Sequence, residues 1–193
     1  GINAEYGEMR SVNIAIIGDC GVGKTTLALR YIQQQYVDDT TATIRCSFYK
    51  KQIDKPQQLQ VQIWDTAGQE QFRSLAPQFY RKSDLILILF DLCQPNGFES
   101  CKQWLLDVQK EPRKIPVFVA GTKFDCTNGD QAQIDRFQVP EGVEKLLLTS
   151  SLTGYNVNEL FEQMVEHFLA QPLQEKQVLF VEDVVQGNKK KCC

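Results

Sequence analysis

The sequence predicts an α/β fold built as a doubly wound, six-stranded and mostly parallel sheet with helices on both faces. Short apolar runs such as DLILILFD and KIPVFVAGTK are typical of strands that are covered on both sides. They alternate with segments of helical periodicity, which favours parallel strand connections. The 193 residues, of which 42% are hydrophobic and 23% are charged, fit one globular domain with a substantial core.

Six strands are expected, near residues 10–18, 43–53, 58–65, 84–91, 115–121 and 145–150. Only a turn-like segment separates the second strand from the third, and it is too short for a helix. These two strands are therefore expected to form an antiparallel hairpin at one edge of the sheet. Three other segments have the periodicity of amphipathic helices: TLALRYIQQQY, GFESCKQWLLDVQK and NVNELFEQMVEHFLA.

The stretch GDCGVGKT follows the first predicted strand and satisfies the pattern G-x-x-x-x-G-K-[ST]. Its glycines allow backbone N–H groups to converge on a phosphate, and the N-terminus of the following helix favours the same anion. Lys24 can reach the outer phosphates, and the hydroxyl of Thr25 can ligate a magnesium ion. The stretch therefore predicts a P-loop NTPase whose phosphate contacts come from Asp19, Cys20, Gly21, Val22, Gly23, Lys24, Thr25 and Thr26.

Three more polar loops follow predicted strands: DTAGQE after the third, GTKFD after the fifth and TSSLTG after the sixth. Ligands of a doubly wound sheet bind beyond the carboxyl ends of the strands, so these loops are expected to share one site with the phosphate loop. Asp65 is suited to holding magnesium through water. Gly68 lets a backbone N–H approach a terminal phosphate, and Gln69 can position a water molecule.

Together with Thr43 in TTATIRCSF, these motifs resemble those of the small GTPases of the Ras superfamily over about residues 10–170. WDTAGQE, FYRKSDLILILFD and the terminal CC resemble the Rab family, whose members direct vesicle traffic. The resemblance implies a GTP-binding domain over residues 1–170 and a flexible tail over residues 171–193. It also implies a GTP/GDP switch that regulates vesicle traffic and slowly hydrolyses GTP.

The resemblance further implies which residues carry hydrolysis. Lys24 absorbs charge on the phosphates, and Gln69 orients the attacking water. Thr43 completes the coordination of Mg²⁺ by Thr25 and Asp65 when the γ-phosphate is present.

The same resemblance implies how guanine is held. Asp125 accepts hydrogen bonds from guanine N1 and N2, and a buried carboxylate at this position rejects adenine. Lys123 and Tyr36 cover the two faces of the base, and the backbone N–H of Ser151 meets guanine O6. The remaining nucleotide contacts fall to Gly68, Thr122, Ser150 and Leu152.

Residues 37–47 and 65–80 are implied as the two switches, which engage effectors, an exchange factor and a GTPase-activating protein. Phe48, Trp64 and Phe79 resemble the aromatic triad that Rab proteins present to effectors. The same three residues are also compatible with an ordinary core position, so both interpretations stay open.

The sequence departs from the family pattern at several positions. Cys20 stands where Ras has a glycine beside the γ-phosphate. Thr122 replaces the asparagine of the usual NKxD motif, and its shorter side chain predicts a weaker tether on the phosphate loop. Ser151 and Leu152 replace the usual alanine and lysine. These differences indicate a divergent Rab.

The chain ends in KKKCC. The resemblance implies that Cys192 and Cys193 receive two geranylgeranyl groups, with the Rab escort protein and the geranylgeranyl transferase as partners. One lipid chain binds membranes marginally, whereas two hydrophobic signals give stable anchoring. The expected localisation is cytoplasmic, with cycling to the cytoplasmic face of an intracellular membrane.

Three other functions remain open at this point. A Rho- or Ras-type signalling GTPase is supported by Thr122 and opposed by the paired terminal cysteines. A nucleotide-binding pseudo-GTPase scaffold is opposed by the presence of Lys24, Thr43 and Gln69. An ATP-using P-loop kinase or ATPase is opposed by Asp125. The net charge of −3 gives no reason to expect nucleic acid as a partner.

Overall fold

The computed structural model describes residues 10–37, 46–55, 57–66, 76–127 and 137–172. Within them lies one six-stranded sheet with the order β2-β3-β1-β4-β5-β6. Its strands are β1 (Ser11–Gly18), β2 (Ser47–Ile53), β3 (Leu59–Asp65), β4 (Leu85–Asp91), β5 (Val117–Thr122) and β6 (Lys145–Leu148). Only the β2–β3 pair is antiparallel; the other four pairings are parallel. The predicted doubly wound sheet with an antiparallel edge hairpin is confirmed.

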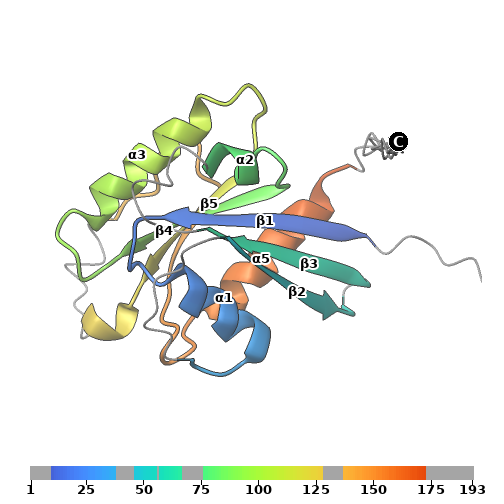
Figure 1. The fold of residues 1–193 in the computed structure, drawn as a ribbon, viewed down its shortest axis with the longest axis horizontal. Helices are drawn as coiled ribbons and strands as arrows, with labels where there is room; N and C mark the ends of the chain where they lie inside the picture. Colours follow the sequence, from blue (N-terminus) through green and yellow to red (C-terminus); the bar gives the residue numbers. More distant parts are fainter. Residues whose placement is uncertain (1–9, 38–45, 56, 67–75, 128–136, 173–193) are drawn as a thin grey trace, which may run out of the picture.

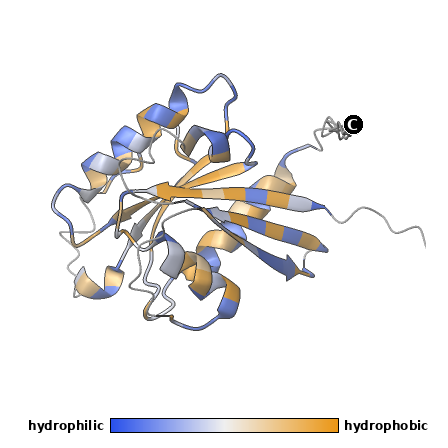
Figure 2. Cartoon of the chain, viewed as in Figure 1, coloured by the Kyte–Doolittle hydropathy of each residue, from blue (hydrophilic) through white to orange (hydrophobic). Residues whose placement is uncertain are grey.

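The burial of each strand follows its place in the sheet. Every residue of the central strand β4 is buried, which explains its unbroken apolar run. β2 lies at the edge and alternates between half-buried and exposed residues, as a strand with one wet face does. Figure 2 shows the same contrast, with apolar residues gathered on the central strands and polar residues along β2.

Helices cover both faces of the sheet (Figure 1). Helices α1 (Lys24–Gln33) and α5 (Val157–Ala170) pack on one face, where their apolar side chains share a core with Ile14 and Ile16. The short helix α2 (Ala76–Tyr80) and α3 (Gly97–Gln109) pack on the other face against Ala15 and Ile17. Successive residues of β1 therefore point to opposite cores.

Some element boundaries differ from the sequence prediction. The first helix was expected to reach Tyr36 but ends at Gln33, because Gln34 adopts a left-handed conformation (φ 58°) and its N–H closes the helix on the carbonyl of Arg30 at 3.0 Å. Strand β5 begins at Val117, after a proline that has no N–H for the sheet. Two short helices, α2 and the 3-10 helix η2 (Phe124–Thr127), have too few residues to show a period and were not predicted.

The carboxyl ends of β1, β3, β5 and β6 lead into the polar loops that the sequence singled out. The turn after β1 depends on a glycine. Gly18 has φ +142°, and a Cβ at this position would collide with the carbonyl oxygen of Leu89 on the neighbouring strand. A side chain here would push β1 and β4 apart at the base of the phosphate loop.

Candidate functional site

The phosphate loop runs from the end of β1 to the start of α1. Gly23 caps the helix with a left-handed backbone (φ 88°). The first hydrogen bond across this turn joins the N–H of Leu27 to the carbonyl of Gly23 at 2.9 Å. The N–H groups of the first helical turn therefore face the loop, as in an anion site at a helix N-terminus.

Lys24 is the cation of this loop and is itself buried. Its ammonium donates hydrogen bonds to the carbonyl oxygens of Gly18 at 2.9 Å and Asp19 at 2.6 Å, so the side chain curls back over the loop. Burial lowers the pKa of the Lys24 ammonium, and the carboxylate of Asp65 offsets part of this effect. A partly dehydrated cation gains most from an anion bound beside it.

The side-chain oxygens of Thr25 and Asp65 come together from two separate elements. The hydroxyl of Thr25 on α1 donates to Oδ2 of the buried Asp65 at the end of β3, at 2.6 Å. Among the described residues, no group of three or more His, Cys, Asp and Glu side chains gathers to hold a metal. Mg²⁺ prefers oxygen ligands and is usually bound by one or two protein groups together with phosphate and water. Two oxygen-bearing side chains therefore fit Mg²⁺ better than they fit a metal that needs a complete set of protein ligands.

Thr122, the first residue of the TKFD motif, is hydrogen-bonded to the phosphate loop. Its hydroxyl lies 2.7 Å from the carbonyl oxygen of Val22 and 3.0 Å from that of Phe90. The sequence predicted a weak tether because the threonine side chain is short. The structure shows that the Thr122 hydroxyl is nevertheless long enough to contact the phosphate loop at Val22. The hydroxyl has one proton for two acceptors, so the phosphate loop and β4 share one hydrogen bond.

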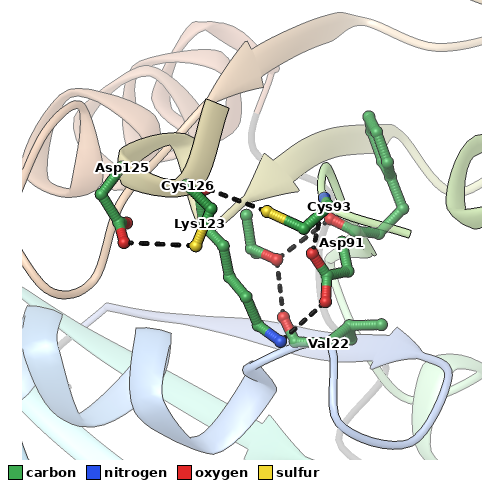
Figure 3. A network of polar contacts seen from close by, with 8 residues as sticks. Val22, Asp91, Cys93, Lys123, Asp125 and Cys126 are labelled. Carbon is green, nitrogen blue, oxygen red and sulfur yellow. Dashed lines mark hydrogen bonds and ion pairs between the residues drawn. The ribbon is translucent and has the colours of Figure 1, made fainter. Parts of the chain in front are cut away.

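Lys123 is held in place by the end of β4. Its backbone is left-handed (φ 61°), and its ammonium forms an ion pair with Oδ2 of Asp91 at 2.7 Å (Figure 3). The carboxylate of Asp91 is buried, and its Oδ1 accepts the N–H of Cys93 at 2.8 Å. This ion pair fixes the ammonium end of Lys123, and the side chain as a whole is partly exposed.

Asp125 and Ser150 join the loops that follow β5 and β6. The hydroxyl of the buried Ser150 donates to Oδ1 of Asp125 and accepts the N–H of Thr153 at 3.1 Å. The backbone N–H of Phe124 donates to the carbonyl of Thr149 at 3.0 Å. Asp125 itself is exposed and lies in the short helix η2.

The other predicted site residues divide into two groups. Tyr36 and Leu152 are exposed, at 41% and 52%, and Ser151 is half-buried. Thr43, Gly68, Gln69, Cys192 and Cys193 lie outside the described residues, together with most of both predicted switches.

Three contributors to the loops were missed from the sequence. Asp91 ends an apolar strand, as Asp65 does, so its position was a usable signal. Ser100 and Trp104 on α3 both donate hydrogen bonds to the carboxylate of Asp19. No sequence pattern relates residues that lie more than 80 positions apart.

The three aromatic residues Phe48 on β2, Trp64 on β3 and Phe79 on α2 form a row. The ring centroids of Phe48 and Trp64 lie 4.4 Å apart, and those of Trp64 and Phe79 lie 6.4 Å apart. Phe48 is 40% exposed, and the other two are half-buried. The row is therefore part of the surface rather than of the closed core.

This fold and these loops define a P-loop nucleotide-binding protein. A model of the Ras family matches residues 13–170. The chain is 34% identical to the GTP-binding protein ypt5 of Schizosaccharomyces pombe, over 84% of this chain and 79% of that protein. It is 32% identical to mouse Ras-related protein Rab-22A, over 79% and 81%, and 33% identical to mouse Rab-17, over 81% and 75%. The chain belongs to the Ras family, as a Rab-family small GTPase.

Membership of this family sets the chemistry. The protein binds GTP and GDP with Mg²⁺ and hydrolyses GTP, and a role in vesicle traffic is typical of the Rab family. The Rab and Ypt relatives favour this family over a Rho-type GTPase. In the described part of the chain, no helix combines the length and the apolar character needed to cross a membrane.

Proposed function

We propose that the loops after β1, β3, β5 and β6 form the guanine-nucleotide site of a Rab-type switch, with the residue roles that the motifs imply. The observation that carries the proposal is a set of hydrogen bonds between loops. Thr122 bonds the carbonyl of Val22, and Ser150 bonds the carboxylate of Asp125, so the phosphate loop and both base-side loops form one network. A network of this kind holds phosphates and base at a fixed separation.

In this proposal, Lys24 and the first turn of α1 hold the phosphates, and Thr25 and Asp65 hold Mg²⁺ with Thr43. The metal supplies charge neutralisation at the phosphate oxygens. Gln69 orients a water molecule in line with the γ-phosphate, and Lys24 balances the charge that develops there. Tyr36 and Lys123 cover the base, which Asp125 and the N–H of Ser151 read.

Affinity measurements with purified protein test the site directly. GTP and GDP are expected to bind far more tightly than ATP, and chelation of Mg²⁺ is expected to weaken both. Equal affinity for ATP and GTP would contradict the assignment of Asp125 and Ser151 to the base. Nucleotide affinity that stays unchanged after Mg²⁺ is chelated would contradict the assignment of Thr25 and Asp65 to Mg²⁺.

Changing Gln69 to leucine is expected to leave GTP binding intact while hydrolysis slows at least tenfold. Leucine keeps the bulk of the side chain but has no group that orients water. Single-turnover hydrolysis of preloaded GTP, with and without an activating protein, measures the effect. The exposed Gln103 on α3 serves as the control, because Gln103→Leu makes the same change away from the nucleotide loops. Turnover at the parent rate in Gln69→Leu would remove Gln69 from the mechanism.

The proposal extends to partners. Residues 37–47 and 65–80 act as switches toward effectors, an exchange factor and a GTPase-activating protein. The aromatic row of Phe48, Trp64 and Phe79 supports an effector surface, because a half-exposed aromatic cluster is an energetically favourable contact for a partner. The row includes Trp64 of β3, the strand that leads into the second switch.

The proposal also covers the tail. Residues 1–170 form the GTP-binding domain, and residues 171–193 act as a tether that is modified at Cys192 and Cys193 by the geranylgeranyl transferase with its escort protein. Two lipid chains with the preceding lysines suffice for stable anchoring on an anionic leaflet. The protein then cycles between the cytoplasm and the cytoplasmic face of an intracellular membrane.

Replacing both Cys192 and Cys193 with serine is expected to move the protein from the membrane fraction to the cytosol. The GTP affinity is expected to stay unchanged, because the tail makes no part of the proposed site. Cell fractionation measures the distribution. The control is Cys93→Ser with Cys126→Ser, which alters two exposed thiols of the domain and is expected to leave the distribution unchanged. These thiols contact the carbonyl of Lys123 and the carboxylate of Asp125, so the GTP affinity of the control is measured as well. Persistent membrane association of the tail variant would place the anchor elsewhere.

A further inference from the structure

The phosphate loop carries a carboxylate of its own, at Asp19. A negative charge beside bound phosphates repels them, and the repulsion is strong where little water separates the charges. The loop therefore needs a way to direct this side chain elsewhere. The structure shows where the carboxylate goes.

Both oxygens of the Asp19 carboxylate are engaged by α3. The indole Nε1–H of Trp104 donates to Oδ1 at 2.8 Å, and the hydroxyl of Ser100 donates to Oδ2. The two donors are four residues apart, so they stand on one face of the helix, one turn apart. Trp104 is buried and Ser100 is half-buried. The carboxylate is thus aimed at α3.

The backbone of the same residue reaches the catalytic lysine. The carbonyl oxygen of Asp19 accepts a hydrogen bond from the ammonium of Lys24 at 2.6 Å. A chain of contacts therefore runs from α3 through the side chain and the backbone of Asp19 to Lys24. On the other side of Asp19, Gly18 is packed tightly against the carbonyl of Leu89, so the loop has little freedom to absorb a movement.

The chemistry of the two donors suits an ionised acceptor. An indole N–H can only donate, and a carboxylate can only accept, so the Trp104 contact has one possible sense. Hydrogen bonds to a charged group are stronger than neutral ones and cost more when they are lost. Each donor also offsets negative charge that would otherwise face the phosphates.

We propose that Ser100 and Trp104 are positioning residues of the nucleotide site: they hold the Asp19 carboxylate on α3, away from the phosphates, and thereby fix the carbonyl that orients Lys24. This rests on the proposed nucleotide site. It makes α3 a regulator of nucleotide retention, since any displacement of α3 releases a negative charge beside the phosphates and loosens Lys24.

The test is a double-mutant cycle read as the rate of GDP dissociation from the full chain with Mg²⁺ present. Trp104→Phe removes the indole N–H but keeps an aromatic ring, and Ser100→Ala removes the hydroxyl with little change of volume. Each is expected to raise the dissociation rate about tenfold, the size expected for loss of a hydrogen bond to a charged group. In an Asp19→Ala background, neither substitution is expected to raise the rate further.

The control separates positioning from packing. Val108 is buried one turn beyond Trp104 on α3 and has no hydrogen-bonding side chain. Val108→Ala is expected to lower the unfolding temperature but to leave GDP dissociation unchanged, with or without Asp19→Ala. Ser100→Ala keeps the test available if Trp104→Phe does not fold, because Ser100 is not a core residue.

Two results would overturn the positioning role. One is a GDP dissociation rate equal to the parent rate in both donor variants; the other is an equal rise in this rate for Trp104→Phe in the parent and in the Asp19→Ala background. A rise caused by Val108→Ala that matches the donor variants would assign the effect to packing. A failure of the nucleotide site is seen separately, because the unmodified protein itself would then not retain GDP.

Discussion

Replacing Asp125 with asparagine is expected to move the base preference from guanine toward xanthine nucleotides. Guanine presents two donors at N1 and N2, which a carboxylate accepts together. An asparagine presents one acceptor and one donor, and xanthine has a carbonyl where guanine has its amino group. Mismatching a polar group built to bind a base costs about 10²-fold or more in affinity, so GDP binding is expected to fall by at least this factor while XDP binding rises.

The substitution is expected to keep the hydrogen bond between residue 125 and Ser150, and with it the contact between the two loops. The amide oxygen of an asparagine can still accept the Ser150 hydroxyl that Oδ1 of Asp125 accepts. Competition between GDP and XDP for the purified variant measures the preference. Asp54→Asn is the control, since it makes the same change at an exposed carboxylate on the β2–β3 hairpin. An intact guanine preference in Asp125→Asn would mean that another group reads the base.

Changing Lys24 to alanine is expected to reduce the affinity for both GTP and GDP by roughly 10²-fold or more. The substitution removes the charge-assisted contact to the phosphates and the hydrogen bonds that hold the loop at Gly18 and Asp19. Thr25→Asn is expected to act differently, because it removes a proposed ligand of Mg²⁺ and so weakens binding most when magnesium is present. Equilibrium titration of GTP and GDP with and without Mg²⁺ distinguishes the two.

Lys51 provides a matched control for Lys24. Lys51 is half-buried. Its ammonium donates a hydrogen bond to the backbone carbonyl of Tyr31 at 2.7 Å and lies over the Tyr31 ring. Burial lowers the pKa of Lys51 as it does that of Lys24. Lys51→Ala is therefore expected to lower stability while nucleotide affinity stays at the parent value. Equal losses of affinity in both variants would show that Lys24 acts through the fold and not through phosphate contact.

The features that could be predicted from the sequence are those that depend on neighbouring residues in the chain. The continuous apolar runs located β4 and β5. The short connection between the second and third predicted strands identified the antiparallel edge of the sheet. The phosphate loop was recognisable because its glycines, Lys24 and Thr25 occupy fixed spacings. The bond between Thr25 and Asp65 agrees with the proposal that both ligate one ion.

What escaped prediction depends on contacts between distant segments or on very short elements. The end of α1 at Gln33 follows from the left-handed backbone of Gln34, a residue type that gives little sign of it. The helix η2, which carries Asp125, has only one turn and so shows no period in the sequence. The reach of Thr122 to Val22 depends on how closely β5 approaches the phosphate loop, a distance set by packing of the whole sheet.

The contact between Trp104 and Asp19 also gives this protein an optical reporter. The chain has two tryptophans, and the other, Trp64, lies in the aromatic row on β3. The excited indole has a larger dipole than the ground state, so its fluorescence shifts when a charge beside the ring moves. A Trp64→Phe protein would emit from Trp104 alone, whose Nε1–H touches the carboxylate of the phosphate loop. Its emission would therefore report any release of the Asp19 carboxylate from α3, with no dye attached to protein or ligand.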